Sequence, residues 1–382
     1  MAHVRVPISG PMVQWAVERT GHTAAELTTQ AGFKQVNAWL EEKQHPTFEQ
    51  AKRLAKKAGI PFGFLFLPEP VDLTPDLPDF RTRANNRISN ISRELEEQIA
   101  FCQRSLSWYT DNATEFGGLP PEHLGSATVK NDPQAVAERM REIVGWDSSV
   151  ATHGRTHVNM LADCLENYGL LVMKGSVVGN KTNAKLDTDE FRGFTLIDRG
   201  HALVFINTAD AATANLFSLA HEFGHVLLGQ QGVSSDNDHH QVERWCNQFA
   251  ATLLLPEALL ADAQFENPID IEYLSKKSRT LGPSVEAIVW RLAALGFLEA
   301  DRARELVRRW NSVVKPKKAD LKTSGGPRPA VMTRSRLGRN FVEALSEAYD
   351  EGTLSYADAV QFTGYKRVAV LEKVLNLDAG ER

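Results

Sequence analysis

The segment FSLAHEFGHVLL, residues 217–228, contains two histidines, His221 and His225, that are four positions apart. On an α-helix this spacing places both imidazoles on one face, about one turn apart, so they can converge on a single metal ion. Glu222 lies beside that face, where its carboxylate can accept a proton from an attacking water molecule. The pattern therefore predicts a catalytic zinc site carried by a helix.

The sequence on either side of this segment supplies the elements that such a site needs. Residues 202–206, ALVFI, form a short apolar run that favours a buried strand, and polar residues typical of a helix start follow at 207–210. From residue 211 to 228 apolar side chains recur at three- and four-residue steps, and Gly229 is placed to end the helix. We expect a strand that leads directly into the zinc-binding helix.

Zinc needs a third protein ligand, and the best candidate is Glu243, the first residue of ERWCNQFAATLLLP, residues 243–256. Pro256 ends this second predicted helix, and three of its residues share one face at helical spacing: Cys246, Phe249 and Leu253. Glu243 would then lie near the start of a helix that faces the first one. Cys246 is the weaker candidate ligand, because its position fits the buried face and small buried cysteines are common.

Several roles of the histidines remain open. His221 and His225 could be a purely structural pair, although a chance His-Glu-x-x-His pattern is expected in only about two in a hundred chains of this composition. His239 and His240 lie in a polar loop that begins at Ser234, and we expect them to be solvated rather than metal ligands. The candidates for stabilising the oxyanion are His239, His240, Arg192 and Tyr168.

Four blocks of this sequence resemble the ImmA/IrrE family of metallo-endopeptidases: DEFRGF at 189–194, VFIN at 204–207, FSLAHEFGH at 217–225 and the segment 243–256. The resemblance is strong over roughly residues 133–256. It implies a gluzincin-like zinc peptidase in which Glu222 is the base and the zinc ligands are His221, His225 and Glu243. Members of this family typically cleave a repressor or act in stress, phage-related or toxin–antitoxin circuits.

Composition favours a cytoplasmic protein of two or three domains. The 382 residues carry a formal net charge of -5, which neither demands nor excludes a nucleic-acid partner, because local basic patches matter more than the total. Three cysteines far apart in the chain give no disulfide framework. Neither a signal peptide nor an apolar run of membrane length is evident, so we expect a cytoplasmic protein without a membrane partner.

Residues 1–70 are predicted to form a small helical module, in which Thr23 and Glu26 make a capping box at one helix start. The module resembles the helix-turn-helix domain of phage-type repressors in the order of Leu27, Trp39, Glu41, Pro46, Leu54 and Ile60. This resemblance implies sequence-specific DNA binding. The candidate DNA contacts are Lys34, Gln35 and Asn37.

This module departs from the repressor pattern in one interval. The distance in sequence from Leu27 to Trp39 is about two residues shorter than in typical members, which would shorten the recognition helix that enters the major groove. A basic helix face is also present, but such faces are common on ordinary solvated helices: Lys52, Arg53, Lys56 and Lys57. The module could therefore serve protein contacts instead of DNA binding.

We expect an α+β fold that is mainly helical and has four parts. These are a helix-turn-helix-like domain at 1–70, a linker and connecting helix at 71–130, the zinc metallopeptidase domain at 131–300 and a helical C-terminal region at 301–382. Within the peptidase domain, an edge strand of the predicted hairpin 194–206 would pair with an extended substrate. The C-terminal region could dock a partner or regulate the enzyme, although simple packing is the more economical expectation.

The zinc-binding pattern predicts a zinc-dependent endopeptidase. The resemblance implies that it acts on a regulatory protein, either a repressor or a component of a toxin–antitoxin or stress circuit, and that it is fused to a DNA-binding domain. The alternative is a DNA-binding transcriptional regulator or antitoxin whose zinc site is structural or sensory. Zinc is the expected cofactor in both cases.

Overall fold

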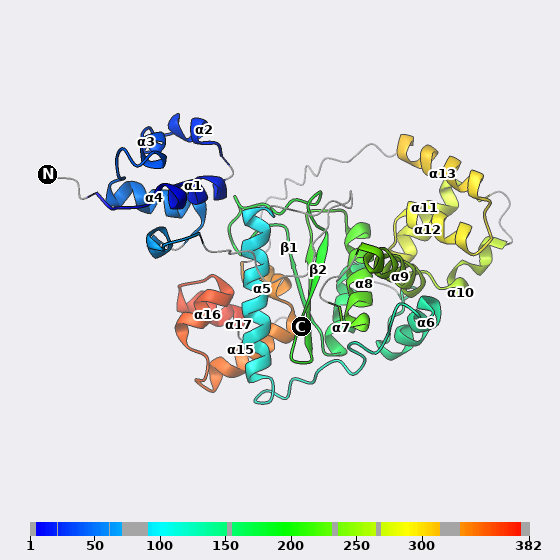
Figure 1. Ribbon diagram of the computed structural model, residues 1–382. Coiled ribbons are helices and arrows are strands. Elements are labelled where there is room, and N and C mark those ends of the chain that lie inside the picture. The colour runs from blue at the N-terminus through cyan, green and yellow to red at the C-terminus, as the bar shows by residue number, and fades with distance from the viewer. Residues whose placement is uncertain are drawn as a thin grey trace. The chain divides into compact units, whose positions relative to one another are not determined.

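The computed structural model of this protein describes residues 5–20, 22–60, 62–70, 91–150, 155–230, 236–264, 269–313 and 329–375. The chain separates into two compact units, Met1–Pro75 and Asp76–Arg382. Both are mainly helical, and the second also contains a three-stranded sheet (Figure 1). This arrangement agrees with the expected α+β class. No helix in the described part of the chain is both long and apolar enough to span a membrane.

The first unit is a cluster of short helices. Their bounds are Gly10–Arg19 (α1), Ala24–Thr28 (α2), Val36–Leu40 (α3), Phe48–Ala58 (α4) and, for the 3-10 helix η1, Phe62–Phe66. The capping box predicted at Thr23 is confirmed, and Thr47 forms a second one at the start of α4. Apolar residues of every helix meet in one core, in which Trp39 of α3 is only 1% exposed.

The second unit is built around a mixed sheet. Its strands are Leu171–Gly175 (β1), Gly193–Asp198 (β2) and His201–Asn207 (β3). The order is β1-β3-β2, with β1 parallel and β2 antiparallel to β3. The apolar run predicted to be a strand is therefore the central one, and β2 lies at an edge of the sheet.

Side chains that alternate along β3 enter two different cores. Val204 and Ile206 point to one core, whereas Leu203 and Phe205 point to the other. All seven residues of β3 are buried. A continuous apolar run is the pattern expected of a strand that is covered on both faces, which explains why this segment shows no polar alternation.

One face of the sheet is covered by helices from the middle of the chain. They include Pro133–Ile143 (α6), His157–Asn167 (α7), Ala212–Leu228 (α8) and Asp236–Leu254 (α9). Of these, α7 packs on β1 and α8 on β2 and β3, whereas α9 packs on α8 and α6 on α9. The same core extends into Glu257–Leu260 (α10), Ala261–Gln264 (η2), Ile271–Leu281 (α11), Val285–Ala294 (α12) and Ala300–Val313 (α13). Figure 1 shows α7 and α8 standing beside the strands and α9 on the far side of α8.

The other face is covered by Arg93–Asn112 (α5) and by the C-terminal helices. The predicted apolar stripe of α5 is fully buried and comprises Leu95, Ile99, Cys102, Leu106 and Tyr109. This stripe packs on β2 and β3, so α5 belongs to the sheet's second core, whereas we had expected a helix spanning the space between domains. An amphipathic helix of this length is stabilised mainly by burying its apolar face, which the sheet provides.

The C-terminal helices are part of the same core. They are Pro329–Leu337 (α14), Arg339–Asp350 (α15), Tyr356–Thr363 (α16) and Val368–Leu375 (α17). Of these, α14 and α15 contact β1 directly. The C-terminal helices therefore pack against the sheet, which is the simpler of the two roles expected from the sequence. The basic Gly/Pro-rich segment that precedes it, residues 315–327, lies outside the described residues.

Candidate metal centre

The helix α8 carries the histidine pair, as its sequence predicts. It begins at Ala212 directly after β3 and ends at Gly229, whose φ of 64° is the left-handed conformation that glycine adopts most easily. His221 and His225 project side by side from it, with 3.2 Å between their Nε2 atoms. Their side chains are only 15% and 13% exposed, so both imidazoles are held inside the unit.

Glu243 on α9 faces both histidines. Its Oε2 lies 3.3 Å from Nε2 of His221, and its Oε1 lies 3.2 Å from Nε2 of His225. Among the described residues this is the one group of three or more His, Cys, Asp or Glu side chains whose ligand atoms converge, all within 4.8 Å of one another. The three residues predicted as ligands are thus brought together at one point.

Close packing of the two helices allows this meeting. A Cβ atom placed on Gly224 would lie 3.1 Å from Sγ and 3.3 Å from Cα of Cys246. Glycine at this position therefore lets α9 approach α8 more closely than a side chain would allow. Cys246 follows Glu243 by three residues, about one helical turn, so the same contact that buries the cysteine brings the glutamate to the histidines.

The charges of the cluster show that its residues suit a divalent cation. Burial tends to raise the pKa of Glu243, but hydrogen bonds with the imidazoles of His221 and His225 outweigh it and hold that pKa below its usual range. Burial lowers the pKa of His221, but bonding to Glu243 outweighs it and raises that pKa. The Glu243 carboxylate is therefore ionised beside the two imidazoles, and a carboxylate must be ionised to bind a metal.

Cys246 does not share this property. Burial raises the pKa of its thiol well above the ordinary value, and the carboxylates of Glu243 and Glu222 add to the effect. A metal ligand must be a thiolate, which this environment disfavours. The environment of Cys246 therefore supports the choice of Glu243 over the cysteine.

Asn247 is a member of the site that our sequence reasoning missed. Its Oδ1 lies 3.1 Å from Nδ1 of His221. When a cation takes the place of the proton on Nε2, an N–H at Nδ1 that donates to this oxygen leaves the Nε2 lone pair for the metal, which is the tautomer that a metal ligand needs. The available signal was its spacing, because Asn247 follows Glu243 by four residues and therefore lies on the same helix face.

Glu222, the neighbour of His221 on α8, is hydrogen-bonded to the edge strand β2. It is 8% exposed, and its Oε2 accepts a hydrogen bond of 2.8 Å from Oγ1 of Thr195. Gly193 leaves room for the same side chain, because a Cβ at that position would lie 3.1 Å from Cγ of Glu222. The carboxylate beside the histidines is therefore positioned by the edge strand of the sheet.

The residues considered for the oxyanion lie in different surroundings. Arg192 pairs with Asp210, with 3.4 Å between Nε and Oδ2. The Tyr168 hydroxyl accepts a 2.8 Å hydrogen bond from the His123 amide, and its ring packs against Phe223 in the core. The sequence predicts a loop around His239 and His240, but both residues belong to α9, which begins at Asp236. The side chains of these two histidines are not among the described residues.

The three candidate DNA contacts are all on the surface of the first unit. Lys34 and Gln35 immediately precede α3, Asn37 lies in it, and all three side chains are exposed. The helix α3 has five residues, which at 1.5 Å per residue gives a length of about 7.5 Å. This is short for a helix that must follow a major groove, and DNA binding stays a prediction.

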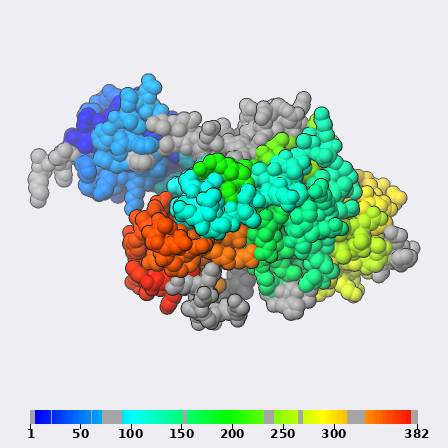
Figure 2. Space-filling view, turned by 90° about the horizontal axis from the view of Figure 1, so that it is seen from below, coloured from blue at the N-terminus to red at the C-terminus, as the bar shows by residue number. Residues whose placement is uncertain are grey.

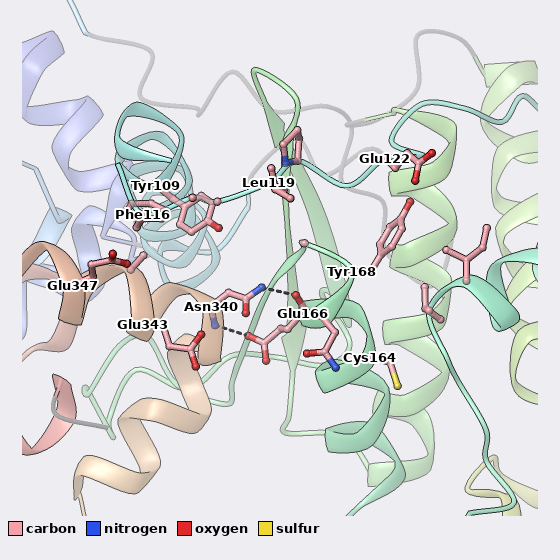
Figure 3. A pocket seen from close by; sticks show the side chains of 18 residues that line it. Tyr109, Phe116, Leu119, Glu122, Cys164, Glu166, Tyr168, Asn340, Glu343 and Glu347 are labelled. Carbon is pink, nitrogen blue, oxygen red and sulfur yellow. Dashed lines mark hydrogen bonds between the residues drawn. The ribbon is translucent and has the colours of Figure 1, made fainter. Parts of the chain in front are cut away.

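A separate cavity lies at the end of the sheet where β1 begins (Figure 3). Its volume is about 580 Å³, and none of the candidate metal ligands lines it. Figure 2 is seen from this end and shows the segment after α5 in cyan and α15 in orange next to one another. The carboxylates in its wall are Glu122, Glu166, Glu343 and Glu347.

Glu166 in this cavity has a structural task. Its Oε1 accepts a 3.2 Å hydrogen bond from the amide of Asn340, and its backbone oxygen accepts one of 2.6 Å from the Asn340 side chain (Figure 3). The carboxylate therefore caps the first turn of α15. Burial raises the pKa of Glu166 to about 7, against the opposite pull of the Asn340 amide and of the charges on Arg339 and Lys174.

Comparison with known proteins agrees with the geometry. Residues 166–293, which include β1 to β3, α8 and α9, match the family described as the IrrE N-terminal-like domain. A stretch of 74 residues is 38% identical to the radiation response metalloprotease IrrE of Deinococcus radiodurans and covers 17% of this chain and 23% of that relative. These matches support the ImmA/IrrE family, and with it a metal-dependent protease, for the part of the chain that holds the histidine pair.

Proposed function

We propose that this chain is a zinc-dependent endopeptidase that cleaves a regulatory protein, either a repressor or a component of a stress or toxin–antitoxin circuit. The observation that carries the proposal is the convergence of His221, His225 and Glu243, with ligand atoms within 4.8 Å of one another. Glu222 follows His221 in the sequence of the same helix. Two imidazoles and one carboxylate are a donor set that catalytic zinc uses in peptidases. The match of residues 166–293 to the IrrE N-terminal-like domain, and the similarity of 74 residues of the chain to a metalloprotease, add to the support.

The chemistry follows from the positions of the side chains. Zinc, when bound by these three residues, supplies a Lewis acid that polarises a carbonyl and makes water more acidic. Glu222 accepts the proton of the water that attacks the peptide carbonyl and passes it to the nitrogen of the departing amine as the C–N bond breaks. Asn247 holds His221 in the required orientation throughout.

The edge of the sheet offers a place for an extended substrate. The amide of Asn207 donates to the oxygen of Arg192 at 2.8 Å, so these two residues form a hydrogen-bonded pair of the β2–β3 ladder. Alternation then directs the backbone groups of Gly193 and Thr195 away from β3, toward the side of β2 on which the described residues place no further strand. A polypeptide strand can add to such an edge, which favours a protein substrate over a small molecule.

Metal analysis combined with a cleavage assay tests the proposal. The purified protein is incubated with the product of the neighbouring gene and with a mixed peptide library, with and without a chelator. We expect about one zinc per chain, as such three-residue sites bind a single ion, and cleavage that disappears on chelation and returns on adding zinc. A zinc-loaded protein that cuts neither the candidate protein nor any peptide would refute the peptidase function.

A DNA-binding regulator with a structural or sensory zinc site is the second candidate. The observation that favours it is the exposure of Lys34, Gln35 and Asn37 around the start of α3 in the first unit. Binding to its own promoter that weakens steeply with salt, and that is lost when these three residues are changed to alanine, would support it. If such binding occurs without any proteolysis, this second function replaces the first.

A further inference from the structure

The edge strand β2 meets Glu222 at two positions on one face. Gly193 and Thr195 are two residues apart and therefore point to the same side of the strand. At Gly193 the missing side chain makes room, since an added Cβ would lie 3.1 Å from Cγ of Glu222. At Thr195 a hydroxyl reaches the end of the same side chain, with 2.8 Å between Oγ1 and Oε2.

The hydroxyl of Thr195 has one proton and two acceptors in reach. The two acceptors are Oε2 of Glu222 at 2.8 Å and the backbone oxygen of Glu222 at 3.1 Å. A carbonyl inside a helix already accepts the amide four residues later, and hydrogen bonds to a charged acceptor are shorter and stronger than those to a neutral one. The carboxylate is therefore the preferred acceptor.

We propose that Thr195 is a positioning residue that fixes Glu222 by engaging Oε2, so that Oε1 remains to take the proton from the attacking water. This inference rests on the proposed peptidase function. A carboxylate without this bond is free to rotate about its last torsion and exchange its two oxygens. The hydrogen bond removes that freedom before the substrate arrives, which is the preorganisation that catalytic groups require.

The same residue also borders the place where a substrate would add. The backbone N–H and C=O of Thr195 are directed away from β3, to the side of β2 where the described residues hold no further strand, while its side chain is directed toward Glu222. Thr195 thus links β2, to which the polypeptide substrate would add, to the carboxylate of Glu222, which would act on that substrate. Gly193 repeats the arrangement one pleat earlier, with its backbone at the edge and its Cα against Glu222.

The alternative is that Thr195 is present only because β-branched residues suit strands. Valine would then serve equally well, since it has the same shape without the hydroxyl. A matched control exists at Thr252 on α9, which is 1% exposed and whose hydroxyl has no hydrogen-bond partner among the described residues. Replacing Thr252 by valine removes a buried hydroxyl without removing a hydrogen bond.

The test compares Thr195→Val, Thr195→Ser and Thr252→Val as full-length, zinc-loaded proteins on a peptide that the wild type cleaves. We expect Thr195→Val to lower kcat by about tenfold, as the loss of one hydrogen bond to a charged group predicts. KM and zinc content should stay at the wild-type values. Thr195→Ser retains the hydroxyl and should restore most of the rate, and Thr252→Val should leave kcat unchanged.

Undiminished kcat in Thr195→Val overturns the inference, and so does a Thr195→Ser enzyme that is as slow as Thr195→Val. If the valine variant does not fold, Thr195→Ala against Thr195→Ser gives the same comparison, because that pair also differs only in the hydroxyl. These outcomes are distinct from a failure of the proposed function. In that case the wild-type protein would bind zinc and cleave nothing.

Discussion

Two carboxylates of the second unit, the half-buried Glu243 and the buried Glu166, have pKa values that are shifted in opposite directions. Glu243 is hydrogen-bonded to two imidazoles, which hold its pKa below the usual range against the effect of burial. For Glu166 burial dominates and raises the pKa to about 7, although a backbone amide and two more distant cations act against it. Burial alone therefore does not decide whether a carboxylate stays charged, because two imidazole partners outweigh it at Glu243 while one backbone amide does not at Glu166.

The difference separates a site that can do chemistry from one that completes a fold. At the metal centre the ligand atoms of His221, His225 and Glu243, from two helices, converge on one point where a cation can bind. At the cavity the Glu166 carboxylate accepts a hydrogen bond from the first turn of α15. A Cβ atom placed on Gly338, whose φ is 81°, would lie 2.7 Å from Oε1 of Glu166, so only glycine fits beside this carboxylate. Four predictions test this contrast.

Removal of the charge on Glu222 is expected to have the largest effect. Glu222→Gln should leave zinc binding intact, because this residue is not among the converging ligands, and should lower kcat by about a thousandfold, within the range known for general bases. The measurements are zinc content by atomic absorption and peptide cleavage. Full zinc occupancy with wild-type kcat would show that another group is the base.

Removal of the charge on Glu166 should change the pH dependence of stability. The folded protein binds this proton more tightly than the unfolded chain, since the pKa rises from 4.5 to about 7. The group therefore contributes its full stabilisation below pH 4.5, and that contribution is lost as the pH rises to 7. The amount is about 3 kcal/mol for a pKa difference of this size.

In Glu166→Gln the unfolding free energy should therefore change less between pH 4.5 and pH 7 than in the wild type. The glutamine amide oxygen can still accept the hydrogen bond from Asn340. Urea unfolding at a series of pH values measures this. Glu343→Gln, on the wall of the same cavity but with its side chain 48% exposed, is the control. Equal pH profiles for the wild type and Glu166→Gln would contradict the assignment.

Loss of the Asn247 amide should weaken the metal centre without abolishing it. Asn247→Ala removes the acceptor for Nδ1 of His221, and the loss of such a supporting contact typically costs 10- to 100-fold in metal affinity, about 1.4 to 2.7 kcal/mol. Competition with a zinc chelator measures the affinity. Gln248→Ala, an exposed neighbour on the same helix, should bind zinc as the wild type does. Equal affinity in both variants would exclude this supporting role.

The smallest effect is expected at the contact between α8 and α9. Gly224→Ala places a methyl group 3.1 Å from Sγ of Cys246, and such overpacking costs about 1 to 3 kcal/mol. The better helix propensity of alanine offsets about 1 kcal/mol of this. We expect a net loss of about 1 kcal/mol in thermal unfolding, with Gly63→Ala, where no atom lies within 4 Å, as control. A stabilised Gly224→Ala would show that the helices can separate freely.

Local patterns in the sequence predicted the elements well. The histidine spacing in α8, the capping box at Thr23 and the apolar stripe of α5 all follow from the periodicity of a single helix, and each is present. The site partners Thr195 and Asn247 were missed for the opposite reason. Thr195 is 27 residues from Glu222, and the periodicity of a single strand or helix does not predict which of their residues will be in contact.

The sequence by itself determined that a helix would present two histidines on one face with a glutamate beside them, because that geometry depends only on 3.6 residues per turn. It also determined which strand would be buried on both sides. Only the tertiary structure decided that Glu243 meets those histidines, that Thr195 holds Glu222 and that α5 and the C-terminal helices share one core. These contacts depend on how closely separate elements pack, and packing is settled by all of their surfaces together.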